Sequence, residues 1–265
     1  MSEDAKTVIN NSIETSDNKK LRRIMLTVSY DGTNYHGWQY QPESITVEQV
    51  LNEALSELTG EAIEVSGSSR TDAGVHALGN LCVFDTYSRI PAEKFPYALN
   101  QRLPEDIRIQ KGEDVADDFH PRFVETRKTY EYRILNTKFE IPLKRINTYH
   151  YYIPLDENKM NAAGKYLIGE HDFTSFCSVN AQSETRVRTI TDLSVVREGD
   201  EIVIRVTGNG FLYNMVRIIA GTLIDVGRGQ IEVDSLPNII EAKDRAKSGP
   251  TAPPQGLTLI GYQFV

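Results

Sequence analysis

The sequence predicts an α+β protein built from two split β-α-β units with antiparallel sheets. Three observations lead to this fold class. Predicted elements in the first part of the chain follow the order β-α-β-β-α-β, the second part repeats that order, and the best-defined helix carries a single apolar stripe. Such helices cover one face of an antiparallel sheet and leave the other face free to meet the second unit or a ligand.

The chain divides into a tail and two units. Residues 1–20 are polar, mixed in charge and without sustained periodicity, so we expect a flexible tail. An N-terminal α/β unit is expected over residues 21–118 and a C-terminal α/β unit over residues 119–265. The boundary between the two units falls near residues 115–127.

The elements of the first unit begin with a strand over residues 23–32 that ends at Asp31-Gly32. Thr46 followed by Gln49 forms a capping box, which predicts the start of a helix that closes at Gly60. Its apolar stripe consists of Val47, Val50, Leu51, Ala54, Leu55 and Leu58. The remaining expected elements are strands over 62–67 and 77–87, a helix over 91–103 and a strand over 106–116.

The second unit begins with a strand over residues 128–136 and continues with a helix over 155–169. Two strands over 188–199 and 200–210 follow, and then a strongly apolar helix over 211–227. A Pro- and Gly-rich connection at residues 246–256 leads to a final strand over 258–265.

Composition narrows the classes of protein. No window offers about 18 uninterrupted apolar residues, because Asn214 and Arg217 interrupt the best candidate, so no membrane span is expected. The N-terminus carries acids and lacks an apolar signal core, which favours a cytoplasmic protein and leaves a nuclear one open. Cys82 and Cys177 lie far apart without ligand spacing, so we expect two small buried residues.

Charge gives a mixed indication about nucleic acid. The formal net charge of −8 argues against an RNA or DNA partner at first sight. Between His120 and His150, however, seven Lys or Arg residues stand against three acids, a local balance of +4. A basic track can therefore exist inside an acidic protein.

Several familiar site types are absent from the sequence. It contains neither a phosphate-binding P-loop nor a dinucleotide-binding glycine pattern between a strand and a helix. The five histidines form no pair at metal-ligand spacing, so no metal site is expected. Ser68 or Ser69 with His76 and Asp72 could form a hydrolytic triad, but no nucleophile elbow accompanies them.

Arg70 and Asp72 stand in a segment of small residues, "GSSRTDAGVHALGN", between two predicted strands. One interpretation is an ion pair that stabilises a tight connection, where such exposed pairs contribute about 0 to 1 kcal/mol. The other is a carboxylate kept ionised in a cleft, where an opposite charge lowers its pKa against the upward effect of burial. Such a carboxylate could act as a nucleophile or a base.

At these residues the sequence resembles the tRNA pseudouridine synthase A family. The resemblance covers nearly everything after Leu21 and consists of six blocks in the family's order. They are "YDGTNYHGWQYQ", "SRTDAGVHALG", "DDFHPRFVETRKTYEYRI", "GEHDFTSFC", "GFLYNMVRIIAGTL" and "PPQGLTL". Six ordered blocks are far more specific than one short motif.

The resemblance implies two ferredoxin-like units that face each other across an RNA-binding cleft, in a homodimer that acts on tRNA. It implies no metal and no organic cofactor. The implied reaction is the isomerisation of uridine to pseudouridine in the anticodon arm, in which the bond from C1′ to N1 is cut and the uracil is rejoined through C5. The attack of the catalytic carboxylate on the ribose C1′ or on the uracil C6 stays open.

The resemblance also implies roles for single residues. Asp72 matches the family's catalytic aspartate, and Arg70 matches the arginine that helps displace the target base. Tyr130 matches the tyrosine that packs on the flipped uracil, although Tyr132 lies on the same strand face and competes for this assignment.

Two further residues complete the implied site. Arg217 lies in an apolar helix, where a guanidinium needs an acid partner, and in the family that partner is the catalytic aspartate. Leu257 matches a leucine of the uracil pocket, and an ordinary core leucine is an equally simple interpretation. One position departs from the family: Ser69 stands where a glycine is common, so a positive φ there would strain the loop.

Two other functions stay open at this point. The chain could be an RNA-binding module of the same fold without catalysis, although a retained carboxylate would weaken phosphate binding. It could also be an unrelated hydrolase in which Asp72 and His76 act as base and partner.

Overall fold

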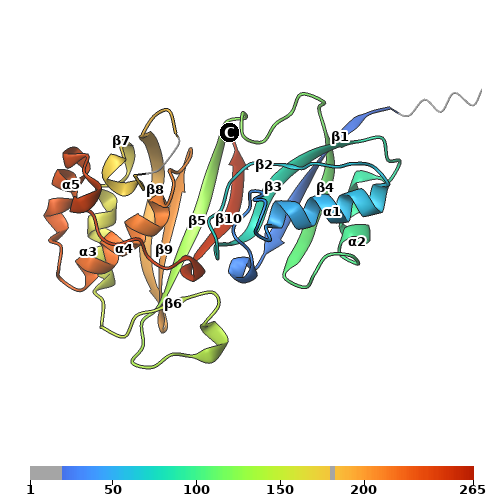
Figure 1. Ribbon diagram of the computed structural model, residues 1–265. Helices are drawn as coiled ribbons and strands as arrows, with labels where there is room; N and C mark the ends of the chain where they lie inside the picture. Colours follow the sequence, from blue (N-terminus) through green and yellow to red (C-terminus); the bar gives the residue numbers. More distant parts are fainter. Residues whose placement is uncertain (1–19, 180–182) are drawn as a thin grey trace, which may run out of the picture.

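The structure is a computed structural model that describes residues 20–179 and 183–265. Residues 1–19, which hold nearly all of the expected tail, lie outside the described residues. The described part is an α+β fold with one large, mostly antiparallel sheet (Figure 1). Its strands are β1 (Arg22–Tyr30), β2 (Ser66–Gly67), β3 (His76–Thr86), β4 (Ile107–Val115), β5 (Thr126–Leu135), β6 (Tyr149–His150), β7 (Gly169–Asp172), β8 (Val187–Glu198), β9 (Glu201–Gly208) and β10 (Leu257–Phe264).

The sheet order is β4-β1-β3-β10-β5-β9-β8-β7, with β2 paired to β3 and β6 paired to β5. The C-terminal strand β10 joins the two halves of the chain. It pairs antiparallel with β5 and parallel with β3, through Thr258 opposite His76 and Leu259 opposite Ala77. The expectation of two separate sheets is therefore wrong, because these two residue pairs between β10 and β3 join the strands into one sheet.

Five α-helices are found in the described residues: α1 (Val47–Thr59), α2 (Phe95–Leu99), α3 (Glu157–Lys165), α4 (Met215–Gly227) and α5 (Leu236–Ala242). In Figure 1, α1 and α2 lie beside β1, β3 and β4, whereas α3, α4 and α5 lie beside β8 and β9.

The first helix confirms the capping argument. Thr46 is the N-cap of α1, and its hydroxyl accepts a hydrogen bond from the Gln49 backbone N–H at 3.3 Å. Gly60 ends the helix in the left-handed conformation at φ 71°. The buried side chains of α1 are four members of the predicted stripe, Val47, Leu51, Ala54 and Leu55. Local sequence therefore determines this helix fully.

The helix expected over residues 91–103 is shorter in the structure. A 3-10 turn over Ala92–Lys94 precedes α2, which ends at Leu99. The next side chain, Asn100, donates its amide to the Ile109 carbonyl at 2.9 Å and accepts the Ile109 N–H at 2.8 Å. These two hydrogen bonds replace the following helical turn with a connection to β4.

The main core is a contiguous cluster of buried side chains that includes residues from both halves of the chain, and Met25, Leu81 and Val83 form a second, smaller cluster. The side chains of β5 alternate between a buried and a charged face. Tyr130 and Tyr132 belong to the main cluster, whereas Glu131 and Arg133 point to the opposite face and pair with each other at 3.0 Å. Cys82 and Cys177 are buried and free, as expected.

Candidate active site

The loop between β2 and β3 carries the Arg-Thr-Asp segment and is held mainly through Thr71. The Thr71 carbonyl accepts a hydrogen bond from the Trp38 N–H at 3.1 Å, and its hydroxyl lies 2.7 Å from the Tyr30 hydroxyl. The Gly74 N–H donates to the Tyr35 carbonyl at 3.2 Å. The backbone approaches so closely that a Cβ on Gly37 would lie 2.4 Å from the Thr71 oxygen. The small residues of this region therefore allow the loop to be clamped.

Ser69 does not strain the loop. Within residues 20–179 and 183–265, the non-glycine residues with positive φ are Asn214 and Lys243, so Ser69 has an ordinary backbone conformation. Its carbonyl accepts a hydrogen bond from the Asn80 amide at 3.0 Å. The positive φ of this loop belongs to Gly74, at 76°. The departure from the family pattern therefore has no conformational cost.

Asp72 pairs with Arg217 across the two halves of the chain, with 3.3 Å between Nη1 and Oδ2. The two side chains are 15% exposed for Arg217 and 22% for Asp72, so solvent or a ligand reaches the carboxylate only partly. Burial raises the pKa of the Asp72 carboxyl above its ordinary value, and the Arg217 guanidinium opposes that rise. The opposite charge therefore offsets burial in part but does not reverse it.

Arg217 lies on α4, and three contacts hold its guanidinium group. Its Nε donates to the Ala252 carbonyl at 2.8 Å, and its Nη1 donates to the Asn214 side-chain oxygen at 2.8 Å in addition to Asp72. Asn214 precedes α4 with φ 61°, a left-handed conformation that asparagine tolerates better than most residues. The sequence analysis did not identify Asn214 as a site residue. Its place just before the helix that carries Arg217 was the signal that could have found it.

Arg70 is exposed and does not pair with Asp72. Among the residues that the structure describes, no hydrogen bond or ion pair holds its guanidinium. Its charge lowers the pKa of Arg122, so the two guanidinium groups lie in each other's field. The interpretation of Arg70 and Asp72 as a structural ion pair is therefore wrong, and Arg70 is available to a ligand.

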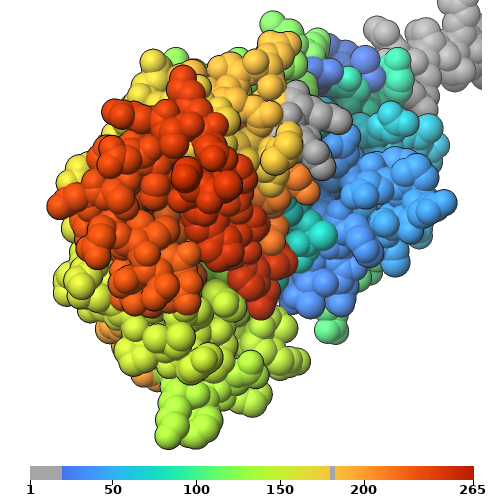
Figure 2. Space-filling view, turned by 60° about the vertical axis from the view of Figure 1, so that its left-hand side comes forward, coloured from blue at the N-terminus to red at the C-terminus, as the bar shows by residue number. Residues whose placement is uncertain are grey.

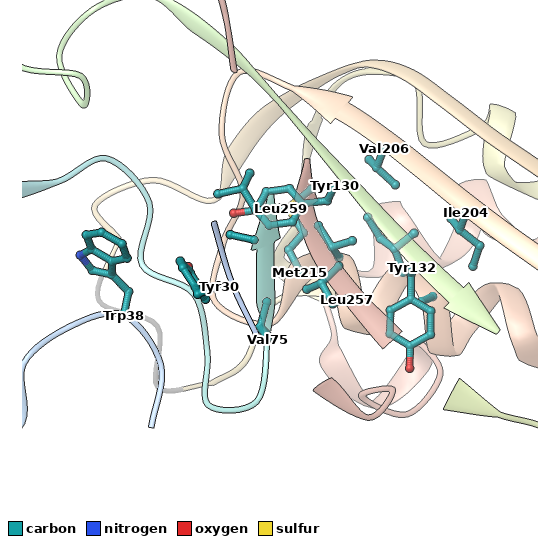
Figure 3. Packing of buried hydrophobic residues seen from close by; sticks show 14 of the residues in the cluster. Tyr30, Trp38, Val75, Tyr130, Tyr132, Ile204, Val206, Met215, Leu257 and Leu259 are labelled. Atoms are coloured by element: carbon teal, nitrogen blue, oxygen red, sulfur yellow. The ribbon is translucent and has the colours of Figure 1, made fainter. Parts of the chain in front are cut away.

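Tyr130 and Tyr132 occupy different surroundings. The Tyr132 hydroxyl donates to the Pro253 carbonyl at 2.8 Å, and the side chain is fully buried. The Tyr130 hydroxyl interacts with Ser69 and lies in the field of Asp72, and its ring packs edge-on against Phe211 at 5.2 Å between centroids. In Figure 3 the Tyr130 hydroxyl points toward the side of Tyr30, away from Tyr132. Tyr130, and not Tyr132, therefore lies beside the loop between β2 and β3.

Leu257 opens β10 and is 5% exposed within the main core cluster. It pairs with Tyr132 across the sheet and follows a turn whose Pro254 approaches Gly74, since a Cβ on Gly74 would lie 3.0 Å from the proline ring. Leu257 therefore packs in the core next to a segment that reaches the loop between β2 and β3, and both sequence interpretations remain compatible with its place.

His76 is tied to the end of β1. Its Nδ1 lies 3.0 Å from the Gly32 nitrogen and 3.0 Å from an Asp31 carboxylate oxygen. The described residues show no hydrogen bond between His76 and Asp72, and His76 lines a pocket with Glu131 and Arg133, which alternate with the core residues of β5. A hydrolytic pair of Asp72 and His76 is therefore not assembled.

Among the described residues, no group of three or more His, Cys, Asp or Glu side chains could hold a metal ion, and no helix has the length and apolar character needed to cross a bilayer. Figure 2 shows the orange and red C-terminal segments and the blue N-terminal segments as two lobes with a furrow between them. The Asp72–Arg217 pair links these two parts of the chain.

Fold and site together define a class of protein. It is an α+β chain in which Asp72, on a clamped loop, pairs with Arg217 from the other half of the chain. The buried Tyr130 lies beside this pair, and Arg70 has no ion-pair partner among the described residues. The family model described as tRNA pseudouridine synthase matches residues 26–124 and 163–264. This chain belongs to the tRNA pseudouridine synthase family.

Curated relatives agree with this membership. The chain is 50% identical over 240 residues to tRNA pseudouridine synthase A of Thermoanaerobacter sp. (strain X514), which covers 91% of this chain and 98% of the relative. It is 48% identical over 244 residues to tRNA pseudouridine synthase A of Acetivibrio thermocellus, with 92% and 100% covered. A solved chain of an H/ACA RNP bound to a substrate RNA containing 2′-deoxyuridine aligns at 14% identity and a TM-score of 0.33, over 76% of this chain and 53% of that one.

Proposed function

We propose that this protein isomerises uridine to pseudouridine in the anticodon arm of tRNA, with Asp72 as the nucleophile. Membership of the tRNA pseudouridine synthase family supports the reaction and the substrate class. The observation that carries the assignment to a residue is the pair of Asp72 and Arg217, 3.3 Å apart, on the clamped loop beside Tyr130.

The reaction needs one covalent partner and no redox change. The Asp72 carboxylate attacks either C1′ of the ribose or C6 of the uracil, the bond between C1′ and N1 breaks, and the uracil turns while it is held. A bond then forms between C1′ and C5, the hydrogen at C5 leaves as a proton, N1 takes up a proton, and the carboxylate is released, so that the product is an isomer of the substrate. Partial burial keeps water from the carboxylate, and Arg217 stabilises its negative charge.

The other site residues act on the displaced nucleotide. Extrusion of a base costs a few kcal/mol, so a site that flips uridine needs groups that replace its stacking and pairing partners. Arg70 is exposed and without an ion pair in the described residues, which suits it to hold the opened RNA. Tyr130 offers a ring on which the uracil can pack, and Leu257 lines the same side of the sheet.

The finer architecture belongs to the same proposal. Strand order β4-β1-β3-β2 in the first half and β10-β5-β9-β8 in the second support two ferredoxin-like split β-α-β units, over residues 21–118 and 119–265. We propose further that the protein works as a homodimer in the cytoplasm and that residues 1–20 form a tail outside the catalytic fold. Size-exclusion chromatography with light scattering tests the dimer.

Release of tritium from tRNA transcripts labelled at uridine C5 tests the function, because the new bond at C5 must expel the label. Native protein is expected to release it, and Asp72→Asn, which removes the charge but keeps the shape, is expected to release none. Asp85→Asn is the matched control, since it breaks another Asp–Arg pair, with Arg23 at 2.7 Å, away from the site.

Two results would contradict the proposal. Binding of tRNA by native protein without any label release would favour an RNA-binding module that lacks catalysis. Undiminished release by Asp72→Asn would remove Asp72 from the mechanism while leaving the reaction in place.

A further inference from the structure

Four cationic side chains from separate segments gather on the side of the sheet where Tyr130 lies. We call them the basic cluster: Arg70, Arg122, Lys128 and Arg188. Arg70 lies close enough to Arg122 to lower the pKa of Arg122, and both Arg122 and Arg188 lower the pKa of Lys128. Arg122 and Arg188 therefore lie near Lys128, and Arg70, from the first half of the chain, joins the group through Arg122.

Two arginines of the basic cluster, Arg122 and Arg188, are held by backbone carbonyls. The Arg122 Nη2 donates to the Gly67 carbonyl at 2.6 Å, which ties it to the start of the catalytic loop. The Arg188 Nη1 donates to the carbonyls of Thr185 at 3.1 Å and Val187 at 2.6 Å. Backbone carbonyls orient these two guanidinium groups, and neither group forms an ion pair in the described residues, although the charge of Glu48 acts to raise the pKa of Arg122.

Lys128 is the centre of the basic cluster. It stands two residues before Tyr130 on β5, so both side chains project from the same face of the strand, about 7 Å apart along it. Its Nζ lies 5.5 Å from the centroid of the Tyr262 ring, and no acid pairs with it among the residues that the structure describes. A desolvated ammonium with cations around it and no counter-ion is costly unless an anion is bound.

We propose that the basic cluster binds a backbone phosphate of the RNA next to the flipped uridine, with Lys128 as its central ligand. This inference rests on the proposed function and adds to it a positioning site for the nucleotide chain. Two features favour a phosphate over the carboxylate of an acidic protein: the guanidinium forks suit its several oxygens, and Lys128 lies within one nucleotide of the ring that would carry the uracil.

The first test is the salt dependence of tRNA binding for Lys128→Gln. Lys159→Gln, which also removes one positive charge, is the control. Lys159 is exposed on α3, away from the basic cluster. Each phosphate contact contributes about 0.7 to 0.9 to the slope of log K against log salt concentration. Lys128→Gln is expected to lower the slope by about that amount and to raise KM more than it changes kcat, whereas Lys159→Gln should match native protein.

The second test uses pH, because burial and the two neighbouring arginines lower the pKa of Lys128 to about 8. Every other group that faces Lys128 is constant between pH 7 and 9: Arg122 and Arg188 stay charged, and Tyr262, whose pKa burial raises to about 12, stays neutral. Affinity of native protein for tRNA should fall about tenfold between pH 7 and pH 9 as Lys128 loses its proton. Lys128→Arg should retain affinity at pH 9.

The salt slope and the pH dependence both measure binding of tRNA, so these two readouts stand apart from catalysis. An unchanged salt slope in Lys128→Gln, or an equal loss of affinity at pH 9 in native protein and Lys128→Arg, would overturn the phosphate site. Tight binding of an acidic peptide in place of RNA would assign the basic cluster to a protein partner. Absence of tritium release from native protein would instead contradict the proposed function and would leave these binding results intact. Thermal unfolding of each variant confirms that it is folded.

Discussion

Arg217 and Asp72, separated by 145 positions in the chain, meet with 3.3 Å between Nη1 and Oδ2. The arginine comes from α4, and the aspartate comes from the loop between β2 and β3. Arg217 also binds the Ala252 carbonyl and the Asn214 side chain, so its position does not depend on Asp72 alone. The C-terminal half of the chain thus supplies a preorganised cation to a carboxylate of the N-terminal half.

Replacement of Arg217 should therefore change the titration of Asp72. Arg217→Gln removes the charge that lowers the Asp72 pKa and leaves the burial that raises it, so the acid limb of kcat/KM should move to higher pH. Misplacement of the carboxylate should also lower kcat by about 10- to 100-fold. The pH profile of tritium release measures both effects.

Arg228→Gln is a suitable control for this prediction, because Arg228 directly follows α4 and pairs with Asp225 at 2.8 Å without reaching the loop. Its pH profile should equal that of native protein. An Arg217→Gln profile with an unmoved acid limb would show that Arg217 does not control the ionisation of Asp72.

Tyr130 should act through its ring more than through its hydroxyl. Tyr130→Phe keeps the packing against Phe211 and loses only the interaction with Ser69, worth about 1 kcal/mol of stability. Tyr130→Ala removes a stacking surface worth about 1 to 3 kcal/mol per base, so kcat/KM should fall about 5- to 150-fold. Single-turnover kinetics with tRNA measures the difference between the two variants.

Tyr132 supplies the matched control. Tyr132→Phe removes the hydrogen bond to Pro253 and should lower the free energy of unfolding by about 1 kcal/mol without changing kcat/KM. Native activity in Tyr130→Ala, or a loss of activity in Tyr132→Phe larger than in Tyr130→Phe, would exchange the assignments of the two tyrosines.

The sequence predicted the elements whose signals are local. Thr46, Gln49 and Gly60 specify both ends of α1, because the caps act on the neighbouring backbone. It did not predict α5, a helix of seven residues with Pro237 in its first turn, because so short a segment shows little periodicity. The joining of the halves through β10 was also missed, since two register pairs between distant strands leave no local pattern.

At the site, it was easier to predict which residues take part than to predict which of them pair with each other. The charged segment pointed to Asp72 and Arg70, and the apolar face around Arg217 predicted an acid partner for it, which the structure confirms as Asp72. Pairing of Arg70 with Asp72 was open from the sequence and is wrong, because neighbours in a turn need not face each other. The local excess of positive charge in the sequence covers only Arg122 and Lys128 of the basic cluster. Arg188 comes near them because β5 and β8 both pair with β9, which leaves no local pattern.

Asp72 should also make the protein less stable at neutral pH. Its pKa in the folded state is raised by burial above that of the unfolded chain, so the unfolded state ionises more readily. Below the unfolded pKa, near 3.8, both states are protonated and the group contributes nothing. Between the unfolded and the folded pKa, the unfolded chain ionises while the folded state stays protonated, so stability falls as pH rises, and above the folded pKa the destabilisation is complete. Asp72→Asn, which carries no charge, should therefore raise Tm relative to native protein at pH 7 and lose that advantage below pH 3.8.

Calorimetry of both proteins across this range, with Asp85→Asn as the control, measures the difference. Arg23 lowers the pKa of Asp85, so this control should show the opposite sign, a lower Tm at pH 7. An Asp72→Asn protein that is less stable than native protein at pH 7 by the same margin as Asp85→Asn would mean that attraction to Arg217 outweighs burial, and that the carboxylate at the centre of the site is held there without strain.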